Sequence, residues 1–187
     1  MADHLTLPGN LPVPTDDGAC DHLPGAAVPA VALPGTDGQM HDLSLLPGRT
    51  VLYVYPRTAR PGVAMPDDWD LIPGARGCTP QSCAFRDHHA ELKAAGAAVF
   101  GLSVQTSGEQ VEAAQRLHLP FVLLSDAALD FAGALRLPTF EAGGVTLLRR
   151  VTLILRGAQV EHVFYPVFPP DRNAADVLGW LRAHPAG

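Results

Sequence analysis

The chain has 187 residues, with 13 Lys and Arg against 19 Asp and Glu and a formal net charge of −6 at pH 7. This excess of negative charge disfavours nucleic acid or an anionic membrane surface as the main partner. Hydrophobic residues make up 47% of the chain and charged residues 17%, which excludes a disordered acidic protein and predicts a globular domain with a core. The longest uncharged apolar stretch, residues 94–102, is much shorter than the roughly 20 residues that span a bilayer, so we expect no membrane segment.

The first residues of the chain and its cysteines indicate the cellular compartment in which we expect the protein. The opening residues have neither the basic start nor the apolar core of a secretory signal. Three cysteines cannot all pair, and in a chain of this length they do not make a disulfide scaffold. We therefore expect a reducing, cytoplasmic location, in which a close pair of cysteines is more often catalytic or metal-binding than structural.

The first part of the chain differs in composition from the rest. Residues 1–26 are rich in Pro, Gly and Asp and lack periodicity, so they are predicted to form an extended arm before one domain over residues 27–187. Residues 50–55, TVLYVY, are a continuous β-branched and aromatic run that is typical of a buried central strand.

A helix is predicted over residues 80–95, with Thr79 as its N-cap and Gly96 as its stop. Strands and helices then alternate, and Thr106 with Glu109 forms a capping box. The further strands are predicted over residues 97–104, 121–124, 150–155 and 160–165, and the further helices over residues 106–117, 125–135 and 173–184. This order predicts an α/β, thioredoxin-like fold with a mixed central sheet flanked by helices.

The connection between the first strand and the first helix is unusually long. Residues 56–77 contain four prolines and three glycines and show no periodicity. A structureless connection longer than about 12 to 15 residues is usually functional or disordered. We interpret these residues as an insertion, and we expect its Met65 and Trp69 to cover the residues that follow as a lid.

Two cysteines lie at the start of the predicted helix. Cys78 is at the helix N-terminus and Cys83 follows five residues later. A thiolate is the reactive form of cysteine and the free N–H groups of a helix start stabilise it, so Cys78 is predicted to be the nucleophile. Lowering a thiol pKa from about 8.5 to about 6 requires roughly 3.4 kcal/mol, whereas a helix end supplies about 0.3 to 2 kcal/mol. A cation must contribute, and the candidates are Arg76, Arg86 and an arginine distant in the sequence.

The same segment has less specific interpretations. The two cysteines could be buried structural thiols. A zinc site would use Cys78, Cys83, His88 and His89. At about 100° of rotation per residue, the first three of these side chains point near 0°, 140° and 280° around the helix axis and cannot converge on one ion. We therefore expect no metal site, and residues 74–77 lack the features of a nucleotide-binding loop.

Residues 77–87, GCTPQSCAFRD, resemble the active-site helix of peroxiredoxins of the Q type, the bacterioferritin comigratory protein group. The likeness covers roughly residues 27–186 and is carried further by residues 54–56, 123–126, 150–155 and 161–164. It implies that Cys78 is the peroxidatic cysteine, Cys83 the resolving cysteine and Arg150 the arginine that polarises the peroxide and holds the thiolate. The supporting residues on the helix would be Thr79, Gln81 and Arg86.

The chain departs from the family pattern in the loop before this helix. Peroxiredoxins carry a proline seven residues, and a Thr or Ser three residues, before the peroxidatic cysteine, and here Leu71 and Ala75 occupy these positions. Residues 56–63 look like the usual loop with Val63 in place of the cysteine. We expect Thr58 to fold back and supply the missing hydroxyl.

The resemblance implies a thiol peroxidase that reduces hydrogen peroxide and organic hydroperoxides through a sulfenic acid and an intramolecular Cys78–Cys83 disulfide. A thioredoxin-type reductant would restore the thiols, without metal or other cofactor, in a monomer or weak dimer. Two alternatives remain open. One is a thiol redox sensor or disulfide interaction protein without efficient turnover. The other is a one-cysteine peroxidase in which Cys20 or an external thiol resolves.

Overall fold

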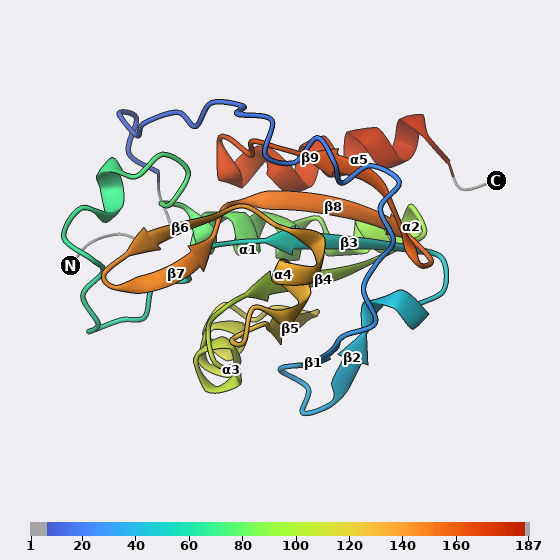
Figure 1. Cartoon of the computed structure of the whole chain (residues 1–187), viewed down its shortest axis with the longest axis horizontal. Helices are drawn as coiled ribbons and strands as arrows, with labels where there is room; N and C mark the ends of the chain where they lie inside the picture. Colours follow the sequence, from blue (N-terminus) through green and yellow to red (C-terminus); the bar gives the residue numbers. More distant parts are fainter. Residues whose placement is uncertain (1–6, 186–187) are drawn as a thin grey trace.

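A five-stranded mixed sheet forms the centre of the computed structural model, which describes residues 7–185. Its strands lie in the order β5 (Val122–Ser125), β4 (Ala97–Ser103), β3 (Arg49–Val54), β8 (Val151–Arg156) and β9 (Gln159–Phe164). The first three are parallel, whereas β8 is antiparallel to β3 and β9 is antiparallel to β8 (Figure 1). The predicted mixed α/β sheet, with its terminal hairpin, is confirmed.

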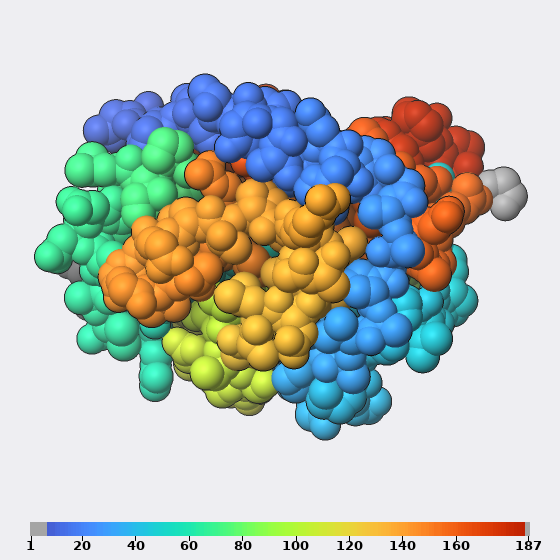
Figure 2. Space-filling model, viewed as in Figure 1, coloured from blue at the N-terminus to red at the C-terminus, as the bar shows by residue number. Residues whose placement is uncertain are grey.

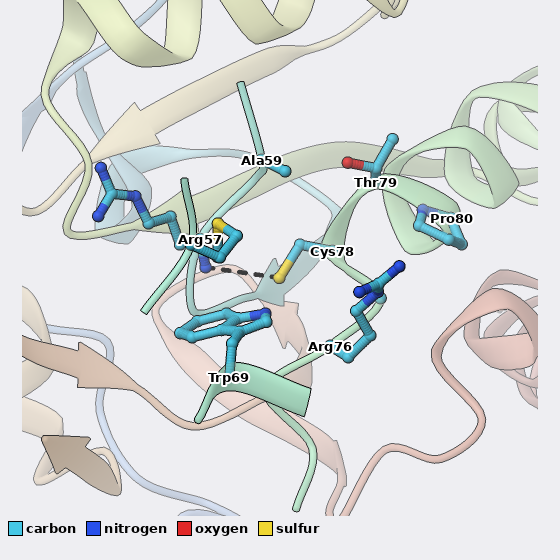
Figure 3. Close-up of a pocket in the computed structure, with 9 residues that line it drawn as sticks. Arg57, Ala59, Trp69, Arg76, Cys78, Thr79 and Pro80 are labelled. Carbon is cyan, nitrogen blue, oxygen red and sulfur yellow. Dashed lines mark hydrogen bonds between the residues drawn. The ribbon is translucent and has the colours of Figure 1, made fainter. Parts of the chain in front are cut away.

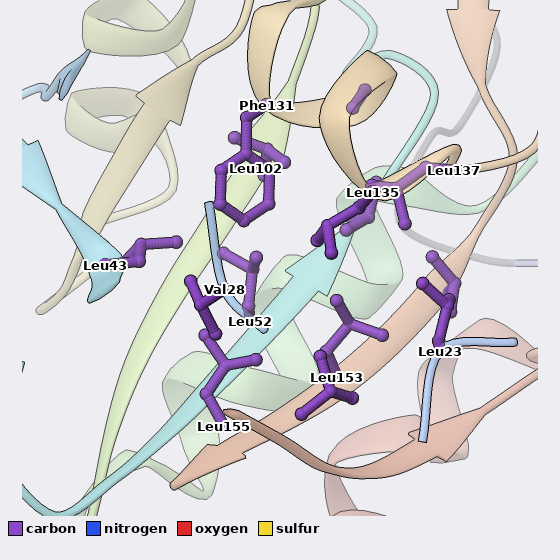
Figure 4. Packing of buried hydrophobic residues seen from close by; sticks show 14 of the residues in the cluster. Leu23, Val28, Leu43, Leu52, Leu102, Phe131, Leu135, Leu137, Leu153 and Leu155 are labelled. Atoms are coloured by element: carbon purple, nitrogen blue, oxygen red, sulfur yellow. The ribbon is translucent and has the colours of Figure 1, made fainter. Parts of the chain in front are cut away.

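Helices cover both faces of the sheet. The α-helices of the described chain are α1 (Cys78–Asp87), α2 (His89–Ala94), α3 (Ser107–Arg116), α4 (Asp130–Leu135) and α5 (Asn173–Ala183). α1, α2 and α5 pack on the face to which Val51 and Tyr53 of β3 point. α4 packs on the opposite face, against Leu52, Leu102 and Leu153 (Figure 4). Within residues 7–185, no helix has both the length and the apolar character needed to cross a membrane.

The predicted single helix over residues 80–95 is wrong in two respects. α1 begins at Cys78 rather than after a Thr79 cap, because Gly77 adopts a φ of +107° and turns the chain into the helix. The helix is then interrupted at His88, which separates α1 from α2. Cys78 therefore lies within the first helical turn, where backbone N–H groups lack helical partners.

We expect any residue with a Cβ at position 77 to strain the backbone and to clash with its surroundings. A Cβ at this position would lie 2.3 Å from Cγ of Pro170, in addition to the cost of a φ of +107°. Gly77→Ala should lower the free energy of unfolding, measured by urea denaturation, by about 3 kcal/mol. Gly96→Ala is the control, because Gly96 has a φ of +80° but a Cβ there would meet nothing within 4 Å. The control should cost about 1 kcal/mol, and equal losses in the two variants would contradict the predicted clash.

The sequence analysis did not predict several short elements of secondary structure. They are the hairpins of β1 (Ala32–Pro34) with β2 (Met40–Asp42) and of β6 (Thr139–Ala142) with β7 (Val145–Leu148), and the 3-10 helices η1 (Leu43–Leu45), η2 (Trp69–Leu71) and η3 (Pro170–Arg172). Strands of three or four residues contain too little alternation to be recognised from hydrophobic periodicity.

The helix predicted over residues 125–135 is shorter than expected and starts only at Asp130. Asp126 still caps it from outside, because its carboxylate accepts hydrogen bonds from the backbone N–H groups of Phe131 at 3.2 Å and Ala132 at 2.8 Å. α3 follows the prediction closely, since both hydrogen bonds of its capping box are present.

The described part of the N-terminal arm, residues 7–26, has no regular helix or strand, turns at residues 18–25 and crosses the surface of the molecule (Figure 2, blue). It joins the edge of β9, where the N–H of Gly25 donates to the carbonyl of Val160 at 2.8 Å. Cys20 and Leu23 of the arm are buried in the core cluster that includes α4. The arm therefore contributes to the core of the domain.

The insertion, residues 56–77, lies beside the β6–β7 hairpin at one end of the molecule (Figure 1, left). The ring of Trp69 in η2 is 6.2 Å from the ring of Phe140 in β6. Trp69 also packs with Ala75 and Leu147 in an apolar cluster separate from the two main ones. These contacts give the insertion a defined conformation in front of the N-terminus of α1.

Candidate active site

Cys78 lies at the start of α1 with 3% of its surface exposed. The backbone N–H of Arg57 donates a hydrogen bond to its sulfur at 3.4 Å (Figure 3), and Nη2 of Arg150 donates another at 3.2 Å. The thiol itself donates to the carbonyl oxygen of Ala75 at 3.6 Å. Two donors and the N-terminus of α1 therefore converge on one sulfur.

The guanidinium of Arg150 is fixed in place by the end of the insertion. Nη2 lies 3.2 Å from each of three consecutive backbone carbonyl oxygens, those of residues 74–76. Nη1 donates to Oε1 of Gln81 in α1, and the whole residue is buried. The insertion therefore supplies a cage of carbonyl groups that holds this cation against the sulfur of Cys78.

The other two candidate cations have different partners. Arg76 lines the cavity at Cys78 and forms an ion pair with Asp70 at 2.8 Å. Arg86 forms an ion pair with Asp87 at 2.8 Å and donates to the backbone carbonyl of Leu117. Arg150, the arginine distant in sequence, is the candidate cation that donates a hydrogen bond to the sulfur of Cys78.

A buried network of side-chain hydrogen bonds extends from Arg150 through Gln81. Nε2 of Gln81 donates to Oδ1 of Asn173 at 3.0 Å, and the hydroxyl of Thr152 donates to the same oxygen at 2.7 Å. All four side chains are buried. The sequence analysis did not select Asn173 or Thr152, although a threonine inside the apolar strand β8 was a usable signal. These hydrogen bonds fix the rotamer of Gln81 and, through Gln81, that of Arg150.

Thr58 does not supply the hydroxyl expected at Cys78, and that prediction is wrong. Its hydroxyl donates to Oε1 of Gln105 at 3.0 Å, and its backbone N–H donates to the same oxygen at 2.8 Å. The buried amide of Gln105 therefore holds Thr58 away from the sulfur. The contact on this side of Cys78 comes instead from the backbone N–H of Arg57.

A narrow cavity of about 20 Å³ lies at Cys78. Met65 and Trp69 of the insertion form part of its wall, as expected for residues that cover the site (Figure 3). Thr79 also lines it. A volume of this size admits about one water-sized group.

Cys83 lies on α1, half-buried and outside the wall of this cavity. Burial raises the pKa of its thiol, although Arg86 and Arg116 oppose that shift. Cys83 is therefore protonated at neutral pH. Arg86 acts electrostatically on Cys83 rather than contacting Cys78.

Cys20 is buried in the core cluster on the sheet face opposite to Cys78. Burial, followed by the charge of Asp17, raises the pKa of Cys20 to about 12. We expect iodoacetamide at neutral pH to leave Cys20 unmodified in the folded protein and to alkylate it only after the protein is unfolded in urea. Peptide mass mapping checks this, and modification of Cys20 in the folded protein would contradict it.

The histidines considered for a zinc site contact different partners. His88 is held by Glu91 at 2.7 Å, and the ring of His89 contacts the ring of Phe121. Across residues 7–185, no three His, Cys, Asp or Glu side chains are grouped in a way that would hold a metal ion.

Comparison with known proteins identifies the family. The redoxin family model matches residues 23–178. Peroxiredoxin Bcp of Escherichia coli (strain K12) is 30% identical over 165 residues, which cover 86% of this chain and 96% of that protein. The chloroplastic peroxiredoxin Q of Oryza sativa subsp. japonica is 32% identical over 161 residues, which cover 85% of this chain. The chain spans 66% of the length of that rice protein.

Solved structures agree with these matches. The crystal structure of peroxidoxin BcpB from Mycobacterium tuberculosis superposes with a TM-score of 0.71 at 27% identity, covering 88% of this chain and 100% of that chain. Peroxiredoxin Q of Xanthomonas campestris, at 20% identity and a TM-score of 0.66 over 94% of this chain and 99% of that one, shares the fold. The chain therefore belongs to the redoxin family and, within it, to the peroxiredoxins of the Q and Bcp type.

Proposed function

We propose that the chain is a thiol peroxidase that reduces hydrogen peroxide and organic hydroperoxides, with Cys78 as its peroxidatic residue. The observation that carries the proposal is the convergence of the Arg57 N–H and the Arg150 guanidinium on the sulfur, beside a cavity that admits a water-sized group. An oxygen atom of a peroxide is a group of that size.

In the first step the thiolate of Cys78 attacks the terminal peroxide oxygen. The sulfur–oxygen bond forms, the oxygen–oxygen bond breaks, and the leaving oxygen takes up a proton to depart as water or an alcohol. Negative charge moves from the sulfur to the leaving oxygen during this step. The guanidinium of Arg150 is fixed beside the sulfur, so it stabilises that charge without reorganisation.

In the second step Cys83 resolves the sulfenic acid. Its protonated thiol condenses with the sulfenic acid of Cys78, a disulfide forms and water leaves. A dithiol protein of the thioredoxin type then reduces the disulfide to two thiols and is itself oxidised. The cycle uses only sulfur chemistry and involves no metal or prosthetic group.

This second step requires α1 to unwind. Residues five apart in a regular helix have Cα atoms about 8.6 Å apart, whereas a disulfide needs them within about 7 Å. Pro80 lacks a backbone N–H, so the first turn has few hydrogen bonds to lose. Amide hydrogen exchange in residues 84–86 should become faster on oxidation. Unchanged exchange with a mapped Cys78–Cys83 disulfide would contradict the unwinding.

Rapid-mixing measurement of the second-order rate at which hydrogen peroxide oxidises Cys78 tests the function. We expect a rate far above that of free cysteine at the same pH, and sustained peroxide consumption when thioredoxin and its reductase are added. A rate equal to that of free cysteine would rule out the peroxidase and favour a redox sensor.

A further inference from the structure

Met65 lies in the insertion and forms part of the wall of the cavity at Cys78. It packs against the apolar cluster that contains Trp69 and is only partly buried. It also lines a second cavity, of about 200 Å³, together with Arg57 and Gln105. The peroxidase mechanism gives this side chain no role, although a thioether is, like a thiol, a group that peroxides oxidise.

We propose that Met65 is a second site of oxidation by peroxide, that its product is methionine sulfoxide, and that the sulfoxide blocks the cavity at Cys78. Excess peroxide then stops the first step of the reaction reversibly, because methionine sulfoxide reductases convert the sulfoxide back to methionine. The oxidation of Met65 stands on the geometry of the cavity, whereas its effect on activity rests on the peroxidase function proposed above.

The size of the cavity brings peroxide against Met65. A space of about 20 Å³ admits about one water-sized group, so an oxygen atom inside it contacts the surrounding wall. Met65 belongs to that wall. A peroxide that reaches the sulfur of Cys78 is therefore also brought next to the side chain of Met65.

The hydrogen-bond donors at Cys78 favour oxygen transfer to a thioether as they do to a thiolate. A lone pair on the sulfur of Met65 attacks the terminal peroxide oxygen, the sulfur–oxygen bond forms and the oxygen–oxygen bond breaks, so the sulfur is oxidised and the peroxide reduced. With hydrogen peroxide, the proton of the transferred oxygen moves to the leaving oxygen, which departs as water. Negative charge develops on that leaving oxygen. The N–H of Arg57 and the guanidinium of Arg150, both fixed at the sulfur of Cys78, stabilise it.

The two sulfur groups do not react equally fast. A thiolate is a stronger nucleophile than a neutral thioether, so Cys78 takes the oxygen first while it is reduced. Met65 reacts when peroxide arrives faster than the reductant restores Cys78. The sulfoxide therefore accumulates in excess peroxide and not during ordinary turnover.

The sulfoxide has the size and polarity to close the cavity. Oxidation adds one oxygen atom to a residue in the wall of a space that admits about one water-sized group. A thioether sulfur is a weak hydrogen-bond acceptor, whereas the sulfoxide is a polar group. The oxygen of the sulfoxide then takes the place, and the hydrogen-bond donors, that the first step requires for the peroxide.

Sulfoxide mapping in the Cys78→Ser variant tests the oxidation. Serine is smaller than cysteine and does not consume peroxide, so the cavity stays open and Met65 remains in contact with it. Met40 in β2 is the internal control, because it is 61% exposed and lies outside the wall of the cavity. Hydrogen peroxide should oxidise Met65 about tenfold or more faster than Met40 in the folded variant, and both at the same rate in urea. Equal or slower oxidation of Met65 in the folded variant would overturn the proposal.

Repair by methionine sulfoxide reductases tests the effect on activity. The unmodified chain, Met65→Leu and Met40→Leu are treated with excess hydrogen peroxide and reduced with dithiothreitol. Peroxide consumption is then measured before and after incubation with both reductases, relative to the same protein before treatment. Leucine nearly conserves the volume of methionine and forms no sulfoxide. The reductases do not act on a sulfinic acid of Cys78, so the activity that they restore was lost through methionine. The unmodified chain and Met40→Leu should regain activity on repair, and Met65→Leu should regain none.

The outcomes separate this proposal from the function on which it rests. If Met65 is oxidised but repair restores no activity to the unmodified chain, the blocking is overturned and the peroxidase function stands. If Met65→Leu regains as much activity as the unmodified chain, Met65 is not the residue responsible and the proposal is overturned. No peroxide consumption by the untreated chain would overturn the peroxidase function and the effect on activity together, while the sulfoxide mapping still decides the oxidation of Met65.

Discussion

Replacing Cys78 with serine should reduce peroxide consumption to the uncatalysed rate. A serine hydroxyl at this position receives the same hydrogen bonds from Arg57 and Arg150, but it stays protonated at neutral pH and cannot form a sulfenic acid. The measurement is steady-state consumption of hydrogen peroxide with thioredoxin and its reductase. Retention of activity would show that another thiol attacks the peroxide.

Cys83→Ser is the matched variant on the same helix. It should still consume one equivalent of peroxide and accumulate a sulfenic acid on Cys78, because the first step does not use Cys83. A sulfenic-acid-specific nucleophile, followed by peptide mass mapping, detects that species. If Cys83→Ser instead blocks the first turnover while Cys78→Ser permits it, the assigned roles are reversed.

Arg150→Met should slow the oxidation of Cys78 by about 10- to 100-fold. Methionine roughly retains the length of the side chain but donates no hydrogen bond, and a hydrogen bond to a charged group contributes about 1.5 to 3 kcal/mol. The sulfur of Cys78 loses its contact with the guanidinium at 3.2 Å. The rate of Cys78 oxidation by hydrogen peroxide is the measurement.

Arg156→Met is the control for Arg150, because Arg156 ends β8, the strand that begins directly after Arg150, with its side chain 53% exposed and paired with Glu161 at 3.4 Å. It should leave the rate of Cys78 oxidation unchanged. Arg150→Lys should be intermediate, because lysine retains the charge but lacks the planar set of donors. Equal slowing in the Arg150 and Arg156 variants would remove the specific role of Arg150.

Patterns local in sequence predicted the central elements. The apolar run at residues 50–55 became β3, because a continuous β-branched and aromatic segment is stable only when both of its faces are buried. The capping box of Thr106 and Glu109 formed because both partners lie within one helical turn. The paired cysteines identified the candidate site for the same reason, since Cys78 and Cys83 belong to one helix.

Interactions between segments distant in the sequence could not be predicted from local sequence patterns. Nothing near Thr58 in sequence indicates that Gln105 accepts a hydrogen bond from its hydroxyl. Nothing near Gln81 indicates that Asn173 accepts one hydrogen bond from the Gln81 amide and another from Thr152. The true start of α1 depends on Gly77, whose positive φ accompanies close packing against η3.

The sequence by itself determined the fold class, and it predicted Cys78 as the nucleophile and the need for a cation, because these follow from periodicity, helix position and the free energy of ionising a thiol. The family resemblance named Arg150, but only the tertiary structure decided that the Arg57 N–H also meets the sulfur and that the insertion holds the Arg150 guanidinium there. The physical reason is that hydrogen bonds act over about 3 Å, and the fold alone brings residues more than 70 positions apart to that distance.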